Sequence, residues 1–162
     1  MGLEIERKFL VGSGAWPKPT TGGVRMRQGY VATEDGTTVR VRIAGDKAFL
    51  TLKDHAFGLT RHEFEYEIPI SDADVLLDTM CMKPQIDKIR YSIPAVEQGL
   101  VWEVDVFLGD NAPLVTAEIE LPSEDTQFVK PGWAGDDVTD DHRYRNSNLA
   151  AHPYSTWGVG LE

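Results

Sequence analysis

Three charged side chains near the start of the chain are spaced so that they could hold a metal-bound phosphate. Glu4, Glu6 and Lys8 lie two residues apart. On a β-strand they would share one face within about 14 Å. Carboxylates are oxygen ligands for a hard divalent cation, and a neighbouring lysine can meet the phosphate that the cation carries. The same spacing also fits a surface helix with a Glu4–Lys8 ion pair, which is the more ordinary arrangement for this segment alone.

Alternation between polar and apolar residues recurs along the chain. In each segment polar or charged residues fall at every second position, as they would on one face of a strand. These segments span residues 4–11, 25–33, 38–44, 48–53, 61–70, 88–91, 101–108 and 114–121. Turn signals separate them, including Asp35-Gly36 and Gly45-Asp46, so the pattern predicts about eight short strands.

Two helices are expected beside these strands. Ser71 is predicted to cap the first helix, with Asp74 as its partner three residues on and an apolar stripe that continues to Met80. A second, short helix is expected after Asn146 and through Ala151. The strands therefore dominate, and the fold class is mainly β (α+β).

Many strands with close turns predict an antiparallel barrel or a sandwich. In an ordinary sandwich the charged faces would meet solvent, and the apolar faces would form the core. We favour the opposite orientation, because the charges within one strand are mostly of one sign and would repel each other without counter-charges nearby. The chain is therefore predicted to form an eight-stranded antiparallel β-barrel with a polar tunnel and a few flanking helices.

The charges on the predicted inward faces indicate which ligand the tunnel would take. Nine acids are Glu4, Glu6, Glu63, Glu65, Glu67, Glu103, Asp105, Glu118 and Glu120, and six bases are Lys8, Arg40, Arg42, Lys53, Lys88 and Arg90. Such a lumen is net negative and would repel a polyphosphate, whereas two divalent cations would reverse its sign. A site for a cation alone would not need six bases. The composition therefore predicts a metal-dependent phosphate site.

Composition excludes several other classes. The 162 residues are 41% hydrophobic and 26% charged, which is typical of one folded domain spanning 1–162. A net charge of −10 disfavours nucleic-acid binding, and no apolar run is long enough for a membrane span. Charges begin at Glu4, so no signal peptide is indicated. The single cysteine, Cys81, allows no internal disulfide and suits a cytoplasmic location.

The ordered motifs resemble the CYTH superfamily, the triphosphate tunnel metalloenzymes, and specifically its short bacterial members. The resemblance rests on Glu4-Ile5-Glu6-Arg7-Lys8, Val39-Arg40-Val41-Arg42, Lys88-Ile89-Arg90-Tyr91, Trp102-Glu103-Val104-Asp105, Ala117-Glu118-Ile119-Glu120 and Arg143-Tyr144-Arg145-Asn146. The family implies an eight-stranded tunnel that binds triphosphate with Mg²⁺ or Mn²⁺ and usually hydrolyses the terminal phosphoanhydride.

The resemblance also implies roles for individual residues. The principal metal ligands would be Glu4, Glu6, Glu118 and Glu120. Glu63, Glu65, Glu103 and Asp105 would bind a second metal or orient the arginines. The phosphates would be held by Lys8, Arg40, Arg42, Lys53, Lys88 and Arg90. Arg143 would reach the tunnel mouth or form a surface ion pair, and Glu67 is not demanded by the motif. In one branch of the family the pair that matches Tyr30 and Lys53 is proposed to act in proton transfer.

We therefore expect a metal-dependent triphosphatase, with inorganic tripolyphosphate as the first choice of substrate and ATP or thiamine triphosphate as alternatives. An adenylate cyclase of the same family is the second hypothesis, although the sequence shows no nucleoside-binding motif. A non-catalytic polyphosphate-binding module is the third. The expected partner is a small triphosphate, with no nucleic acid or membrane, and a homodimer is one option for the assembly.

Overall fold

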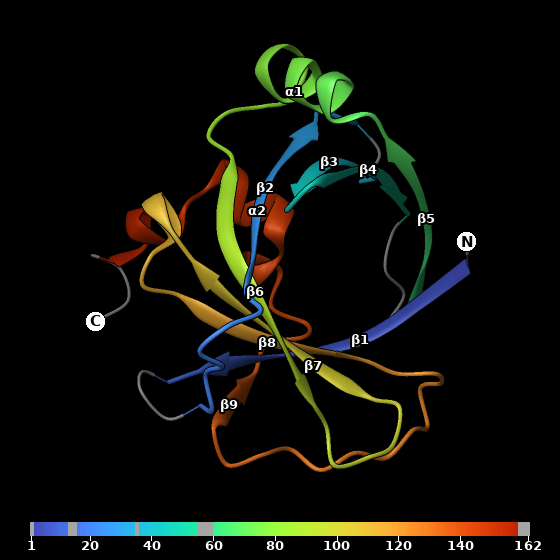
Figure 1. Ribbon diagram of the computed structural model, residues 1–162, viewed down its shortest axis with the longest axis vertical. Helices are drawn as coiled ribbons and strands as arrows, with labels where there is room; N and C mark the ends of the chain where they lie inside the picture. Colours follow the sequence, from blue (N-terminus) through green and yellow to red (C-terminus); the bar gives the residue numbers. More distant parts are fainter. Residues whose placement is uncertain (1, 13–15, 35, 55–59, 159–162) are drawn as a thin grey trace.

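The computed structural model describes residues 2–12, 16–34, 36–54 and 60–158, and its main feature is one antiparallel sheet that curls into a barrel (Figure 1). The strands are β1 (Gly2–Val11), β2 (Val24–Val31), β3 (Thr38–Ala44), β4 (Lys47–Lys53), β5 (Thr60–Ile68), β6 (Ile86–Pro94), β7 (Val101–Phe107), β8 (Val115–Glu120) and β9 (Ala134–Asp137). The helices are α1 (Ile70–Thr79) and α2 (Asn146–Ala151), with 3₁₀ turns at Gly109–Asn111, His142–Tyr144 and Tyr154–Thr156.

The barrel closes through β1, which pairs with β5 and β8 and also, at its end, with the short strand β9. The order along the sheet is β5-β4-β3-β2-β6-β7-β8-β1-β9, with an additional β5–β1 pairing. The first half of β1 pairs with β5, where Glu4 lies opposite Arg61. Its second half pairs with β8, where Lys8 lies opposite Glu118. The predicted barrel of eight strands is confirmed, and the sandwich alternative is wrong.

The predicted element boundaries hold to within a few residues, with two exceptions. The short strand β9 has no polar–apolar alternation and was not predicted. Ser71 is not the cap of α1: the helix begins at Ile70, and its N-cap is Pro69, whose ring fixes an extended backbone at φ −60° and whose carbonyl accepts from Asp72 N. The turn residue Asp35 lies outside the described residues, while Gly45 takes a left-handed φ of 60° between β3 and β4.

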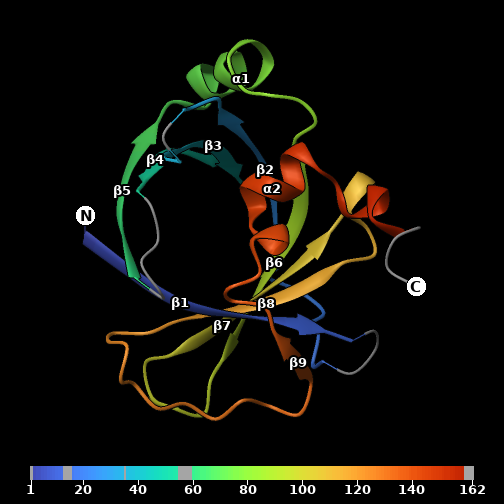
Figure 2. The same cartoon turned by 180° about the vertical axis from the view of Figure 1, so that it is seen from behind.

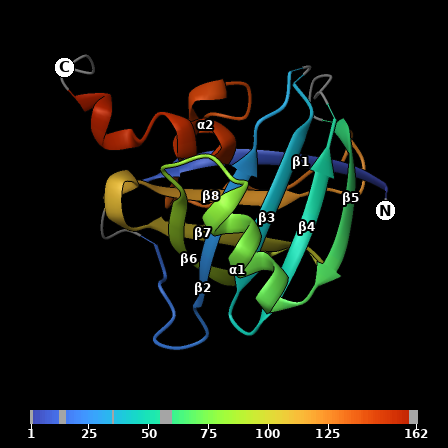
Figure 3. The same cartoon turned by 90° about the horizontal axis from the view of Figure 1, so that it is seen from above.

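Apolar side chains pack mainly against the outside of the barrel. Val41 and Ala48 lie under Leu77 of α1, in the helix that Figure 3 shows across the outer face of β2, β3 and β4. On another side, Phe9 and Trp102 form an aromatic cluster with Phe128, Trp133 and neighbouring aliphatic residues. This outward packing leaves the polar faces of the strands turned into the barrel, as the charge pattern predicted.

An apolar plug closes one end of the barrel. Ile86 and Phe107 fall on the inward faces of their strands, and both pack with Leu149 of α2. The same cluster contains Tyr30 and Tyr144. Figure 2 shows α2 in front of the barrel interior on this side. The inward faces therefore change along the barrel axis from charged residues to an apolar floor; we call these two ends the open end and the plug end.

Gly29 makes close packing of α1 possible. A Cβ on Gly29 would lie 3.0 Å from Cys81 Cβ and 3.1 Å from Leu77 Cδ2. We expect Gly29→Val to lower the free energy of unfolding by about 2–3 kcal/mol, because the branched side chain overfills this contact. Urea denaturation would measure the loss. The control is Gly132→Val, where an added Cβ meets nothing within 4 Å and the change should stay within about 0.5 kcal/mol. Equal effects would contradict the packing argument.

Candidate active site

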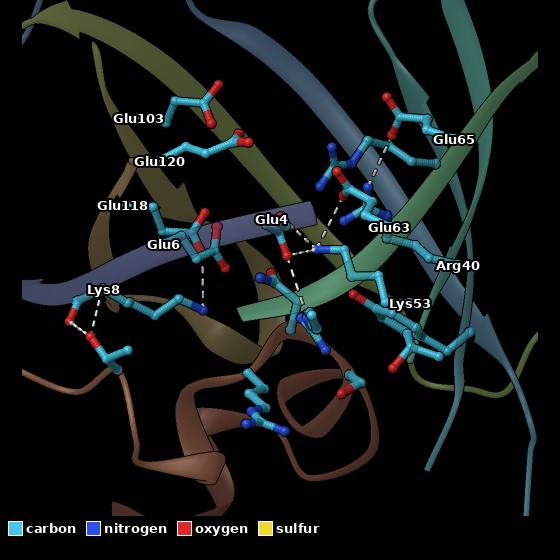
Figure 4. Close-up of a pocket in the computed structure, with 18 of the residues that line it drawn as sticks. Glu4, Glu6, Lys8, Arg40, Lys53, Glu63, Glu65, Glu103, Glu118 and Glu120 are labelled. Carbon is cyan, nitrogen blue, oxygen red and sulfur yellow. Dashed lines mark hydrogen bonds and ion pairs between the residues drawn. The ribbon is translucent and has the colours of Figure 1, made fainter. Parts of the chain in front are cut away.

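The inward charges of the strands converge on one polar cavity of about 290 Å³ (Figure 4). Its carboxylates are Glu4, Glu6, Glu63, Glu65, Glu103, Glu118, Glu120 and Asp141. Its bases are Lys8, Arg40, Arg42, Lys53, Arg61, Arg90 and Arg145. Tyr30, Thr38, Val138, Thr139, Asn146 and Ser147 complete the lining. With eight carboxylates and seven bases, the lining is closer to balance than the nine acids and six bases that alternation alone predicted.

Two bases share the carboxylate of Glu4. Glu4 receives two 3.0 Å hydrogen bonds from Lys53 Nζ and a 3.4 Å contact from Arg61 Nε. Lys53 also lies 3.4 Å from Glu63. Because Glu4 and Lys53 are both buried, neither charge is compensated by bulk water. Two bases and two carboxylates therefore balance each other in this region.

Glu118 has the same bridging position on the other side of the cavity. Lys8 Nζ lies 3.2 Å from one of its oxygens, and Arg90 Nη2 lies 3.3 Å from the other. Burial alone would raise the pKa of the Glu118 carboxyl, but the charges of Lys8 and Arg90 outweigh burial and lower it to about 2. Glu118 is therefore fully ionised at neutral pH.

The two arginines of β3 are buried and incompletely paired. Arg40 donates to Glu65 and Thr51 at 3.3 and 3.2 Å, but its Nε has no hydrogen-bond partner among the described residues. Arg42 donates from Nε to the Gln28 side-chain oxygen at 2.9 Å, and no carboxylate of the described chain pairs with it. Burial, together with repulsion from Arg40 and Arg90, lowers the pKa of Arg42 to about 9. Both guanidinium groups would gain from an anionic ligand.

Tyr30 is positioned by the same glutamine. Because Gln28 Oε1 accepts from Arg42, its amide nitrogen faces Tyr30 and donates to the phenol oxygen at 2.9 Å. The phenol is thus an acceptor on that side, and its own hydrogen is free to point elsewhere. Lys53, the other residue of the predicted proton-transfer pair, lies among the carboxylates Glu4 and Glu63 rather than among other cations.

Glu6 and Glu120 are the carboxylates of the cavity that accept no hydrogen bond or ion pair from the described residues. Burial and the negative charges of Glu118 and Glu4 raise the pKa of Glu6 to about 8. Burial and the charges of Glu4, Glu63 and Glu103 raise the pKa of Glu120. Figure 4 shows Glu120 and Glu103 side by side at one end of the cavity and Glu6 close to Glu118. Crowded carboxylates without cationic partners are the donor set that a hard divalent cation relieves.

The carboxylates do not form a ready-made metal site. Within the described parts of the chain, no group of three or more histidine, cysteine or acidic side chains is arranged to hold a metal ion. Lysine and arginine side chains occupy the space between the acids, as the Lys53–Glu4 and Lys8–Glu118 pairs show. The residues therefore fit a divalent cation by their chemistry, and the ion pairs must rearrange when it binds.

Lys88 and Asp105 do not line the cavity, although both were predicted as site residues. Asp105 is saturated, because its Oδ1 accepts from Arg90 Nε at 2.7 Å and its Oδ2 accepts from Lys88 Nζ at 2.7 Å and Arg90 Nη2 at 2.9 Å. Lys88 is fully buried and also donates to Asn146 Oδ1 of α2 at 3.1 Å. Arg90 and Lys88 hold the pKa of Asp105 far below its usual range against the effect of burial. The pair lies behind Arg90 and anchors it.

Arg143 and Glu67 are also outside the cavity lining. The Arg143 guanidinium pairs with Asp141 at 2.7 Å and lies over the ring of Trp157, with 53% of the side chain exposed. It forms the surface ion pair that was the alternative to a place at the tunnel mouth. Glu67 is exposed on β5, where the inward face has passed the end of the cavity.

Sequence reasoning missed the cavity residues that lie outside the strongest alternation. Arg61 falls on the inward face of β5, two residues before Glu63, and the alternation count could have included it. Arg145, Asn146 and Ser147 come from the segment that enters α2. No periodicity places that segment against the barrel; its signal was the motif Arg143-Tyr144-Arg145-Asn146, in which only Arg143 was given a role. None of the described helices is long and apolar enough to cross a membrane.

The raised pKa of Glu6 predicts a pH dependence of stability. Between 4.5, the ordinary value, and about 8, the folded state binds one more proton than the unfolded state. The free energy of unfolding should therefore fall as pH rises, by about 3 kcal/mol between pH 5 and 8 in chelator. Glu6→Gln should remove this slope, as measured by urea denaturation across the range. Glu67→Gln, at an exposed position, is the control and should keep the slope. If the free energy of unfolding of Glu6→Gln changed with pH in parallel with that of the wild type, the raised pKa would not belong to Glu6.

Comparisons with known proteins agree with the fold. The family model described as the CYTH domain matches residues 2–152. An inorganic triphosphatase of Acetivibrio thermocellus is 48% identical over 157 residues, covering 97% of this chain and 99% of that protein. An inorganic triphosphatase of Nitrosomonas europaea is 39% identical over 150 residues, covering 91% of this chain and 96% of that one. A crystal structure of an inorganic triphosphatase superposes with a TM-score of 0.65 at 37% identity, covering 91% of this chain and 93% of that one. The chain belongs to the CYTH family.

Proposed function

We propose that this protein hydrolyses the terminal phosphoanhydride of inorganic tripolyphosphate bound in its barrel. The observation that carries the proposal is the set of seven bases facing one small cavity, four of them buried. Burying charged groups costs free energy that shared and incomplete ion pairs do not fully offset. A chain of phosphates supplies the missing negative charge. The inorganic triphosphatases at 48% and 39% identity support the same substrate class.

The lining favours an inorganic triphosphate over a nucleotide. Among the described lining residues Tyr30 is the single aromatic, and it is 4% exposed and engaged by Gln28. It offers no free ring face on which a nucleobase could stack. The remaining side chains are nearly all charged or hydroxyl-bearing and suit phosphate oxygens. This argues against the adenylate cyclase alternative, which needs firm nucleoside binding.

The proposed activity requires a divalent cation, Mg²⁺ or Mn²⁺. Glu6 and Glu120 are free to bind it, and Glu4 and Glu118 would join them once phosphates draw Lys53 and Lys8 away. Glu63, Glu65 and Glu103 lie at the cavity and are candidates for a second ion. When bound, a cation would neutralise phosphate charge and activate water for attack on phosphorus. Asp105 has no oxygen left for this role.

The basic residues would position the phosphates. Arg40 and Arg42 present guanidinium groups that can bind phosphate oxygens bidentately, while Lys8 and Lys53 contribute compact charges. Arg90 faces the same cavity and is held by Asp105, with Lys88 in a supporting position behind it. Such positioning and charge stabilisation account for most of the catalysis in phosphoryl transfer. Tyr30, with its hydrogen free, and Lys53 stay our candidates for proton transfer near the terminal phosphate.

We further propose that the protein works as a single domain over 1–162 in the cytoplasm. The lone buried Cys81 suits that compartment. A homodimer stays a prediction from the sequence.

A substrate panel tests the proposed function. Tripolyphosphate should be hydrolysed faster than ATP or thiamine triphosphate, and ATP should give phosphate without cyclic AMP. Activity should vanish in chelator and return with Mg²⁺ or Mn²⁺, because the cation would neutralise charge at the reacting phosphate and activate the attacking water. Phosphate release and cyclic AMP would be measured together. Cyclic AMP with pyrophosphate at a rate above tripolyphosphate cleavage would show a cyclase, and binding of tripolyphosphate without turnover would show a binding module.

Arg42→Lys tests whether the planar guanidinium of Arg42 matters. Lysine keeps the charge but cannot donate to Gln28 and to a phosphate with the same fork, so kcat/KM for tripolyphosphate should fall at least about tenfold, or about 1.4 kcal/mol. The matched control is Arg25→Lys on the surface, where Arg25 pairs with Asp87 at 2.6 Å and 66% of its side chain is exposed. This control should change kcat/KM less than twofold. An equally mild effect at Arg42 would remove it from the phosphate site.

A further inference from the structure

Two arginines of one short segment have opposite environments. Arg143 lies on the surface, paired with Asp141, with 53% of its side chain exposed. Arg145, two residues on, lines the cavity and is half-buried. Its guanidinium makes no hydrogen bond or ion pair with any residue that the structure describes. A half-buried guanidinium that faces a cavity without a partner is free to donate hydrogen bonds to an anion.

The surroundings of Arg145 leave its charge poorly compensated. The neighbouring base is Arg61, whose carboxylate partner Glu4 is already bound by Lys53. Glu6 and Asp140 are the acidic neighbours. Neither carboxylate forms a hydrogen bond or an ion pair with Arg145 in the described part of the chain. This end of the cavity therefore holds two guanidinium groups, of which Arg61 has one 3.4 Å contact with a shared carboxylate and Arg145 has none.

The backbone that carries Arg145 is firmly held. Lys8 Nζ donates to the Tyr144 carbonyl at 2.9 Å, one residue before Arg145. After it, Leu149 is completely buried in the apolar plug, and Leu149 N donates to the Arg145 carbonyl at 2.9 Å. The segment thus fixes the Cα of Arg145 at the floor of the cavity and leaves only its side chain to adjust. Little backbone ordering would accompany binding.

We propose that Arg145 is a substrate-binding residue that holds a phosphate group at the plug end of the tunnel, together with Arg61. The proposal rests on the proposed function for the identity of the anion. It assigns one terminal phosphate of tripolyphosphate to the closed end, opposite the carboxylates Glu103 and Glu120 at the open end. A terminal phosphate carries more charge than a bridging one and gains most from two guanidinium groups.

The test compares Arg145→Gln with Arg143→Gln, two variants with the same chemical change in the same segment. Arg145→Gln should raise the KM for tripolyphosphate about tenfold with a smaller change in kcat, while its melting temperature without ligand stays near that of the wild type. Arg143→Gln should leave KM within twofold. A KM within twofold for Arg145→Gln would overturn the proposal, as would equal increases in the two variants.

A binding measurement separates this proposal from the proposed function. Inorganic tripolyphosphate added in chelator, where no turnover is expected, should raise the melting temperature of the wild type and raise that of Arg145→Gln by less. The same rise in both would overturn the site even if the wild type hydrolyses tripolyphosphate. A wild type that binds but does not hydrolyse would refute the function and leave the Arg145 site supported. If Arg145→Gln does not fold, Arg145→Lys, which keeps the charge, should show a smaller rise in KM; a KM equal to wild type there would overturn the role of the guanidinium.

Discussion

A buried base needs an anion close by, and this requirement explains how the barrel is arranged inside. One carboxylate meets this requirement for two bases at a time: Glu4 pairs with Lys53 and Arg61, and Glu118 pairs with Lys8 and Arg90. Glu4 and Arg61 lie on the paired strands β1 and β5, and Lys8 and Glu118 lie on the paired strands β1 and β8. Lys53 of β4 and Arg90 of β6 reach their carboxylates across one intervening strand, and the three pairs that involve β1 form only when it closes the barrel. Closure and charge compensation therefore depend on each other, and both leave room for an anionic ligand.

The fold was largely predictable because side chains alternate between the two faces of a strand, so that charged and apolar residues alternate in the sequence. The charged and apolar sets of β3 separate cleanly, those of β4 separate apart from Phe49, and both hairpin connections carry glycine-containing turns. The predictions that failed concern segments without that periodicity. The strand β9 is four residues long and takes its partner from the second half of β1. The start of α1 is set by Pro69, whereas Ser71 offered a conventional capping side chain that the helix does not use.

The sequence predicted which side chains of the site point into the barrel, but not how far along the barrel axis each one lies. Alternation correctly turned Glu118 and Arg42 inward, yet it cannot tell how far along the barrel axis a residue lies. Lys88 and Asp105 share the inward faces with Arg90 and Glu103, but they fall next to the apolar plug, where packing encloses them. The plug itself comes from a distant segment without strand periodicity. Its position, and with it the place of Arg145, follows from tertiary packing that a local pattern does not encode.

The plug is more than a cover, because a polar connection joins it to the wall of the tunnel. Asn146 of α2 accepts from Lys88, Lys88 donates to Asp105, and Asp105 binds Arg90 through both oxygens. Every member of this connection is satisfied, which rigidifies a buried polar network rather than weakening it. Arg90 is thereby fixed in the cavity wall by a helix that sits outside the strand order. The end of the chain that seals the barrel thus also helps to set the geometry of the charges that face the phosphates.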